Sequence, residues 1–220
     1  MSRAVWDAIA TAVVSAAALI MLGFYLHDRA GIDDLRPRYE EDWRKWGASG
    51  IRIGSVNATM VIDVFVDFAC PHCLRLTPVL DSVLEKFPHQ VAARFQHFPL
   101  RMEGRSVESA KAIECATEQG RFRAMYGLLS STAPEERQSI PWGILAADSG
   151  VGDLTSFRAC IEEPLERFER VIAGRDLAER LGLQGTPTVW VNGRVFDRGR
   201  SMEAFLEKAE ALGIGNTPTP

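Results

Sequence analysis

The chain has 220 residues, 46% of them hydrophobic, which suits one sizeable domain with an anchor or small subdomain and is too short for two full domains. Its formal net charge is -4, and lysine and arginine are scattered rather than clustered. The sequence therefore lacks the basic patch with which proteins attract phosphate backbones, and no nucleic-acid partner is expected.

The N-terminal segment from Ala8 to Leu26 carries no charged residue. As a helix rising about 1.5 Å per residue, it matches a bilayer hydrocarbon core about 30 Å thick. We therefore predict one N-terminal transmembrane helix within residues 1–27. A cleavable signal peptide is the alternative, although Asp28-Arg29-Ala30 makes a poor small-residue cleavage site.

Residues 28–50 are polar and charged and form a predicted linker. Within them, four large apolar side chains recur at helical spacing around Pro37, namely Leu35, Tyr39, Trp43 and Trp46. This stripe predicts a short amphipathic helix. Its apolar side lies either at a membrane interface or against the domain that follows.

A run of β-branched and aromatic residues from Met60 to Phe68 predicts a strand, buried at the centre of a sheet. It leads directly into Cys70-Pro71-His72-Cys73. The apolar face of a helix follows at Leu76, Val79, Leu80, Val83, Leu84 and Phe87. The two cysteines are thus expected at a strand-to-helix junction.

The remaining elements are a second strand, a helical segment and a hairpin. Val91 to Phe98 predicts the strand, and glycines and prolines break helical periodicity over about 101–181, which indicates a helical insert. Asn192-Gly193 is a strong hairpin signal that joins predicted strands Thr188 to Val191 and Arg194 to Phe196. We also expect a last helix with Met202, Phe205, Leu206 and Ala209 on one side, and a disordered tail over 213–220.

The pair Cys70 and Cys73 has the spacing of a redox-active dithiol. At the start of a helix, unpaired N–H groups and the positive end of the dipole stabilise a thiolate relative to a thiol. Cys70 precedes the helix and should be exposed, whereas Cys73 should be partly covered. Pro71 suits the first helical position, where its missing N–H costs nothing.

His72 is expected to lower the pKa of Cys70 further, because an imidazolium or ring N–H near the sulfur favours its anion. A stable reduced form makes the disulfide an oxidant. A substrate thiolate attacks Cys70, Cys73 leaves, and a second substrate thiol then expels Cys70 as a low-pKa leaving group. The redox-active disulfide needs no further cofactor, but a partner must reoxidise the enzyme.

Two other interpretations of the pair remain. A zinc site needs two more ligands at short spacing, and His89 and His97 have no companion cysteine nearby, so no metal is expected. A purely structural disulfide is the second alternative, although so short a loop would constrain little chain entropy.

The sequence around the pair resembles the DsbA-like branch of the thioredoxin superfamily, from Val66-Asp67-Phe68-Ala69 through the two cysteines to Pro78. Further similar segments are Phe98-Pro99-Leu100, the stretch from Cys115 to Phe122, Gly185-Thr186-Pro187-Thr188, and Val191-Asn192-Gly193. The resemblance covers roughly residues 51–212. It implies an α/β thioredoxin fold that carries the helical insert, and the transmembrane helix predicted from the uncharged N-terminal run precedes this fold.

The same resemblance implies two substrate-binding residues. Pro187 should be cis and face the Cys70 sulfur, and Thr186 should offer backbone groups to a bound peptide as an extra strand. One departure concerns Val64, because relatives often carry a buried carboxylate at this position. Proton transfer involving Cys73 would then use water, Asp63 or Asp67, with a structural role as the default for Asp67.

Cys115 and Cys160 are expected on two helices of the insert, and some DsbA-like proteins carry a second disulfide. A bond between them would close a loop of about 46 residues and contribute about 4 kcal/mol in the chain-entropy model. We predict this structural disulfide, with two buried free thiols as the alternative.

The predicted function is a membrane-tethered thiol:disulfide oxidoreductase, and more narrowly a dithiol oxidase for exported proteins. A reductase or isomerase with the same site is the nearest alternative, followed by a non-catalytic module that uses the thiols to bind metal or a partner. The expected partners are exported protein thiols and a membrane recycling enzyme, DsbB-like or vitamin K epoxide reductase-like.

The predicted location is a single-pass membrane protein with its catalytic domain in the periplasm or outside the cytoplasm, where disulfides persist. Flanking charges point the other way. Arg3 precedes the apolar segment, whereas Arg29, Arg36, Arg38, Arg44 and Lys45 follow it. The positive-inside rule would keep such a domain in the cytoplasm, but long C-terminal domains translocate largely regardless of flanking charge.

Overall fold

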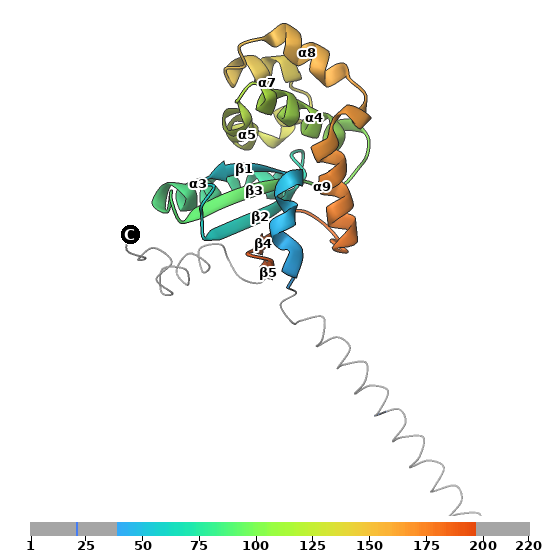
Figure 1. Cartoon of the computed structure of the whole chain (residues 1–220). Coiled ribbons are helices and arrows are strands. Elements are labelled where there is room, and N and C mark those ends of the chain that lie inside the picture. The colour runs from blue at the N-terminus through green and yellow to red at the C-terminus, as the bar shows by residue number, and fades with distance from the viewer. Residues whose placement is uncertain (1–20, 22–38, 197–220) are drawn as a thin grey trace, which may run out of the picture. The chain divides into compact units, whose positions relative to one another are not determined.

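The computed structural model describes Met21 and residues 39–196 (Figure 1). The predicted last helix, the C-terminal tail, most of the predicted anchor and the first part of the predicted linker lie outside these residues. Tyr39 marks the start of the compact unit described below.

A five-stranded mixed sheet forms the centre of this unit, with strand order β1-β3-β2-β4-β5. Its strands are β1 (Gly50–Gly54), β2 (Met60–Val66), β3 (Val91–His97), β4 (Thr188–Val191) and β5 (Arg194–Phe196). The central strands β2 and β3 are parallel, and every other neighbouring pair is antiparallel. Four of the strands match predicted segments, whereas β1 was not predicted.

The hairpin between β4 and β5 turns where the sequence predicted. Asn192 and Gly193 both have positive φ, 48° and 77°, as a two-residue turn of this kind requires. Asn192 also accepts a hydrogen bond from the N–H of Val61 at 2.8 Å, through its side-chain oxygen. The turn is therefore tied to the start of β2.

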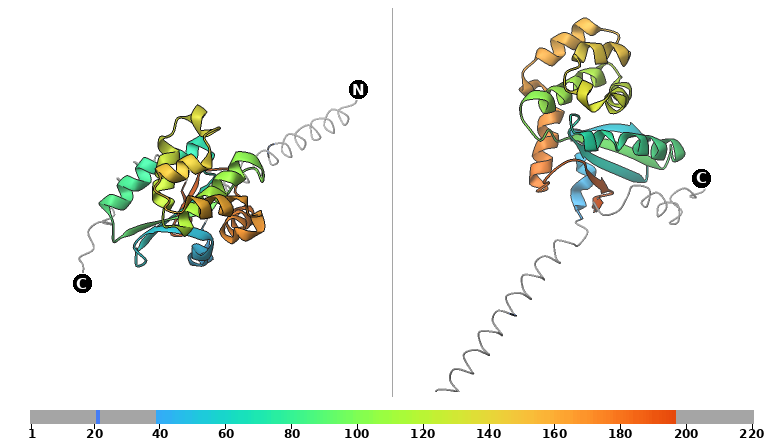
Figure 2. Two further views of the ribbon diagram at one scale, coloured as in Figure 1. Left: turned by 90° about the horizontal axis from the view of Figure 1, so that it is seen from above. Right: turned by 180° about the vertical axis from the view of Figure 1, so that it is seen from behind.

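The helices are interspersed with the strands along the chain. They are the 3-10 helix η1 (Glu41–Ser49), α2 (Pro71–Leu74), α3 (Thr77–Lys86), α4 (Gly104–Glu118), α5 (Phe122–Ser131), α6 (Pro134–Arg137), α7 (Trp142–Asp148), α8 (Leu154–Glu162), the 3-10 turn η2 (Leu165–Arg167) and α9 (Glu169–Arg180). Helices α4 to α9 occupy the segment predicted as the helical insert. Figures 1 and 2 show α4, α5, α7 and α8 grouped on one side of the sheet, with α9 running alongside η1.

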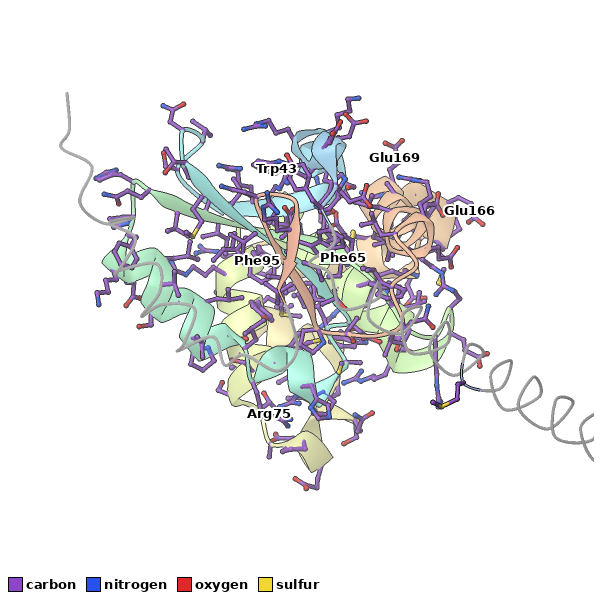
Figure 3. The ribbon with its side chains drawn as sticks, turned by 90° about the horizontal axis from the view of Figure 1, so that it is seen from below. Trp43, Phe65, Arg75, Phe95, Glu166 and Glu169 are labelled. Carbon is purple, nitrogen blue, oxygen red and sulfur yellow. A yellow bond between two sulfur atoms is a disulfide. The ribbon has the colours of Figure 1, made fainter. Side chains whose placement is uncertain are left out.

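Strand β2 is buried on both faces, as expected for a central strand. Its alternate residues Ile62, Val64 and Val66 join a large core with α3 and the insert helices. Val61 and Phe65 point to a second core, formed with η1, α9 and β4. Phe65 and Phe95 lie near the centre of the view in Figure 3, with Arg75 towards its edge.

The second core corrects the predicted linker. Trp43 and Trp46 are each 6% exposed, and Trp46 packs edge-on against Trp190 with ring centroids 5.4 Å apart. Both tryptophans therefore pack against their own domain and not at a membrane interface. The domain begins before the predicted boundary at residue 51, and η1 belongs to its core.

The predicted membrane location is contradicted. Across Met21 and residues 39–196, no helix combines the length and apolar character needed to cross a bilayer. Apart from Met21, the predicted anchor from Ala8 to Leu26 lies outside the described residues.

Candidate active site

The redox pair lies where β2 gives way to α2, as the sequence predicted. Cys70 is the N-cap residue of α2 in an extended conformation, and Pro71 occupies the first turn. The N–H of Cys70 donates to the carbonyl oxygen of Asp67 at 2.9 Å, which fixes the turn between strand and helix. Cys70 is half-buried, Cys73 is fully buried, and both are free thiols.

Cys70 is strongly acidified. The hydrogen bond from the Cys73 thiol is the largest cause, and the backbone N–H groups of Cys73 and His72 and the side chain of Thr186 add to it. Together they outweigh partial burial and lower the pKa of Cys70 to about 5. The sulfur of Cys70 is therefore a thiolate at neutral pH.

Cys73 behaves in the opposite way. Burial raises the pKa of the Cys73 thiol far above its usual range, and the neighbouring Cys70 sulfur raises it further. The pair thus holds one anion and one proton. Such an asymmetric dithiol exposes a nucleophile and good leaving group at Cys70 and keeps Cys73 protonated.

His72 contacts a neighbouring arginine. Its exposed ring lies against Arg75, with 2.5 Å between Nδ1 and the guanidinium Nη2. The contribution of His72 to the lowered pKa of Cys70 comes from its backbone N–H. The expected effect of the imidazole on Cys70 stays a prediction.

The loop before β4 brings Thr186, followed by Pro187, to the redox pair. The peptide bond between them is cis, as the resemblance implied. The carbonyl oxygen of Thr186 lies 3.8 Å from the Cys70 sulfur and accepts a hydrogen bond from it only when Cys70 is protonated. The Thr186 hydroxyl is buried and makes no hydrogen bond among the described residues. The Thr186 side chain nevertheless helps to lower the pKa of Cys70.

Because a thiolate cannot donate to the Thr186 carbonyl, ionised Cys70 should instead accept from the Thr186 hydroxyl. Replacing Thr186 by valine keeps the size of the side chain and removes this donor. We expect the pKa of Cys70 to rise by about half a unit to one unit, since one hydrogen bond contributes roughly 1 kcal/mol. Ultraviolet titration of the thiolate checks this, with Thr188→Val as the control, and an unchanged titration would exclude the hydroxyl as a donor.

The two aspartates that were considered for proton transfer are both engaged elsewhere. Asp67 accepts from the N–H of Ala69 at 2.8 Å, from the N–H of Leu100 at 3.0 Å and from Ser106 Oγ at 2.7 Å. These bonds tie the segment before Cys70 to the start of α4. Asp67 is thus a hydrogen-bonded structural carboxylate, which was its default interpretation.

Asp63 lies on the other face of the sheet, in a buried ion pair with Arg94. Two parallel bonds of 2.7 Å join the guanidinium to the carboxylate. Arg94 also donates to the carbonyl oxygen of Trp43, at 2.9 Å, and Gln96 donates to that of Trp46, at 3.0 Å. The pair thus attaches η1 to the sheet.

Cys115 and Cys160 form the predicted disulfide, with an S–S distance of 1.93 Å and Cα atoms 5.9 Å apart. The bond joins α4 to α8 within the insert. The described residues thus contain one bonded pair of cysteines and one free pair.

Tyr126 is a residue of the site that the sequence did not reveal. Its hydroxyl donates to the carbonyl oxygen of Cys73 at 3.3 Å, across 53 positions of sequence. A single tyrosine on the apolar face of a helix carries no motif, and only the packing of α5 against α2 brings it to the redox pair.

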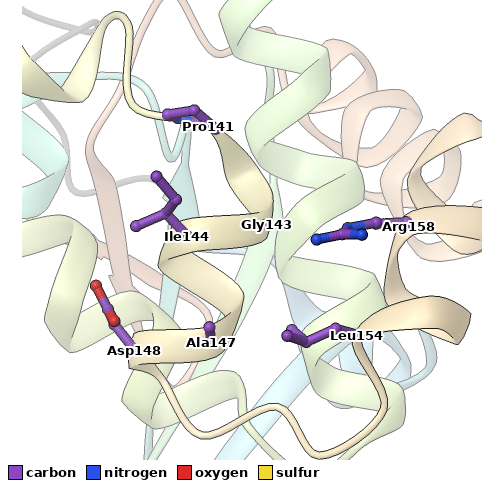
Figure 4. Close-up of a pocket in the computed structure, with 7 residues that line it drawn as sticks. All are labelled: Pro141, Gly143, Ile144, Ala147, Asp148, Leu154 and Arg158. Carbon is purple, nitrogen blue, oxygen red and sulfur yellow. The ribbon is translucent and has the colours of Figure 1, made fainter.

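The structure also has a pocket that lies apart from the redox pair. The pocket, of about 530 Å³ between α7 and α8, is lined by residues that include Ile144, Leu154 and Arg158, and it contains neither redox cysteine (Figure 4).

Within residues 39–196, no three His, Cys, Asp or Glu side chains gather as a metal site would require.

Comparison with known proteins identifies the family. The family model described as Thioredoxin matches residues 48–211. Among curated proteins, the chain is 30% identical over 145 residues to Na(+)/H(+) antiporter NhaA 1 of Mycolicibacterium vanbaalenii, with 64% of this chain and 23% of the relative covered. It is 28% identical over 163 residues to NhaA 3 of Salinispora tropica, with 69% and 23% covered. The chain spans about a quarter of the length of these relatives.

Solved structures share the fold at low identity. Oxidised BdbD from Bacillus subtilis is 19% identical, with 80% of this chain and 96% of that chain covered and a TM-score of 0.65. The reduced disulfide bond oxidoreductase DsbG from Mycobacterium tuberculosis is 21% identical, with the same coverage and a TM-score of 0.60.

The fold, the family match and the dithiol at the start of α2 agree. The chain belongs to the Thioredoxin family, and with its free pair Cys70 and Cys73 it is a thiol:disulfide oxidoreductase of that family.

Proposed function

We propose that the chain is a dithiol oxidase that forms disulfide bonds in exported proteins. The observation that supports this direction most is the low pKa of Cys70, about 5, beside a protonated and buried Cys73. Because this pKa lies below the ordinary thiol value, the thiolate stabilises the reduced fold fully above the ordinary pKa and loses this effect as pH falls towards 5. A stabilised reduced form makes the disulfide form a strong oxidant.

The reaction starts from the Cys70–Cys73 disulfide. A substrate thiolate attacks the Cys70 sulfur, the bond between the cysteines breaks, and Cys73 leaves with the electron pair and takes up a proton. A second substrate thiolate then attacks the substrate sulfur of the mixed disulfide and expels Cys70 as a thiolate. The substrate loses two electrons and gains a disulfide, and the enzyme gains both electrons.

The reduced dithiol must then pass its electrons to an oxidant. We propose a membrane enzyme of the DsbB-like or vitamin K epoxide reductase-like kind as the electron acceptor. The substrate would lie beside the cis-proline loop, where the backbone groups of Thr186 can pair with an extended peptide.

The reduction potential tests the oxidase against a reductase or isomerase. Equilibration with glutathione buffers should give a value well above the roughly -270 mV of thioredoxin, towards the roughly -120 mV of DsbA. Between pH 6 and 8 the potential should fall by about 30 mV per pH unit, because only Cys73 takes up a proton with the two electrons. A value near that of thioredoxin would identify a reductase.

A further inference from the structure

The helix that begins at Cys70 is interrupted directly behind the redox pair. Helix α2 ends at Leu74, and α3 starts at Thr77. The carbonyl oxygen of Cys73 accepts from the N–H of Leu76 at 3.1 Å, three residues further on. In an α-helix the donor would be residue 77, four residues further on, so the chain makes a tighter 3-10 turn here. Pro78 explains the interruption, since it has no N–H for the Leu74 carbonyl and its ring clashes with a continuous helix.

Tyr126 supplies a side-chain donor to this carbonyl, in addition to the backbone donors. Its hydroxyl lies 3.3 Å from the Cys73 oxygen, and the residue is 2% exposed. Three aromatic rings hold the tyrosine ring in place. Phe68 and Phe95 meet it edge-on, at centroid distances of 5.5 and 5.1 Å, and Phe122 stacks on it at 5.8 Å.

The tyrosine is a permanent donor at this position. Burial raises the pKa of the Tyr126 phenol above its ordinary value, so the hydroxyl stays protonated wherever the enzyme works. Its acceptor belongs to the residue whose N–H and thiol both stabilise the Cys70 anion. Holding the Cys73 carbonyl therefore restricts the rotation of the main chain that presents these donors.

We propose that Tyr126 is a positioning residue for the redox pair, because its hydroxyl fixes the first turn of α2 and keeps the donors of Cys73 on the Cys70 sulfur. The inference rests on the proposed oxidase function and adds to it a role for the helical insert. Through α5, the insert sets how oxidising the dithiol is.

Tyr126→Phe is the direct test, because phenylalanine keeps the ring packing and removes only the hydroxyl. The expected result is a rise of about 0.5 to 1 unit in the pKa of Cys70, measured by thiolate absorbance. The equilibrium constant for oxidation of glutathione should fall by roughly three- to tenfold. Ser149→Ala, which removes another buried hydroxyl bonded to a helix carbonyl, serves as the control and should change neither value.

A purely structural role for Tyr126 gives a different outcome. The variant would then lose stability while the pKa of Cys70 and the glutathione equilibrium stayed at their wild-type values, and this result would overturn the proposal. An ordinary pKa for Cys70 in the wild-type protein would instead refute the oxidase function itself. The two failures are therefore distinguishable.

Pro78→Ala provides a second test that does not depend on one substitution. Alanine restores an N–H and removes the ring, so the helix can run on and bring the N–H of Thr77 to the Cys73 carbonyl. In this background the effect of Tyr126→Phe on the pKa of Cys70 should shrink at least twofold. A double-mutant cycle with fully additive effects would contradict the role of the hydroxyl at the interrupted helix.

Discussion

Replacing Cys70 by serine should abolish oxidation of a dithiol peptide, with a loss of at least about a thousandfold. A hydroxyl does not ionise at neutral pH and cannot form the mixed disulfide through which exchange proceeds. The half-buried position of Cys70 makes it the sulfur that a substrate can reach, since Cys73 is fully covered. Single-turnover oxidation of a peptide with two cysteines measures the loss.

Cys73→Ser is the matched variant, with the opposite behaviour. In this variant the Cys70 thiolate can still attack a substrate disulfide and release one substrate thiolate, but the Cys73 thiol that would then displace the bound substrate is missing, so mixed disulfides should accumulate. They should appear as higher-mass bands on non-reducing gels and disappear with dithiothreitol. Equal trapping by both variants, or by neither, would contradict the assignment of the nucleophile to Cys70.

The largest effect on stability is expected at Asp63. Its carboxylate is fully buried against Arg94, so Asp63→Ala leaves an uncompensated guanidinium inside the fold. Removing one partner of a buried ion pair costs about 3 to 5 kcal/mol. Urea unfolding monitored by tryptophan fluorescence should show this loss, because Trp43 and Trp46 pack beside the pair.

Asp42→Ala is the control for this prediction. Asp42 pairs with Lys45 at 2.8 Å, but both side chains are more than 70% exposed, so the change should cost less than about 1 kcal/mol. The double change Asp63→Leu with Arg94→Met should recover much of the stability, because it leaves no unpaired charge. Equal costs at Asp42 and Asp63 would show that the buried pair does not stabilise the fold.

The sequence predicted the elements whose signals are local. Val61 to Val66 is a continuous apolar and β-branched run apart from Asp63, and it forms the central strand. Asn192-Gly193 specified its turn because both residues tolerate positive φ. The sequence also predicted where Cys70 and Cys73 lie, because the strand pattern before them and the helix pattern after them define the junction.

Elements that depend on distant contacts were harder to predict. Strand β1 has only five residues with glycine at both ends, and its pairing with β3 defines it. The tryptophan stripe of η1 suits a membrane interface as well as a protein core. Only the face of the sheet formed by Phe65 and Trp190 decides between them.

The details of the site show the same limit. Neighbouring positions in sequence suggested an effect of the His72 ring on Cys70, but Arg75 lies one helical turn away and engages the ring. Tyr126 and Thr186 reach the redox pair from positions 53 and 116 residues beyond their partners. Interactions of this kind depend on tertiary packing, which the motif does not encode.

Titration of the Cys70 thiol tests most directly whether the protein stabilises the Cys70 thiolate. Thiolate absorbance of the reduced protein should rise with a midpoint near pH 5, and a Cys73→Ala variant should titrate at a higher pH because it loses the donating thiol. Alkylation rates followed over the same pH range give an independent midpoint. A midpoint near 9, the value of an ordinary cysteine, would contradict the stabilised thiolate and with it the oxidase.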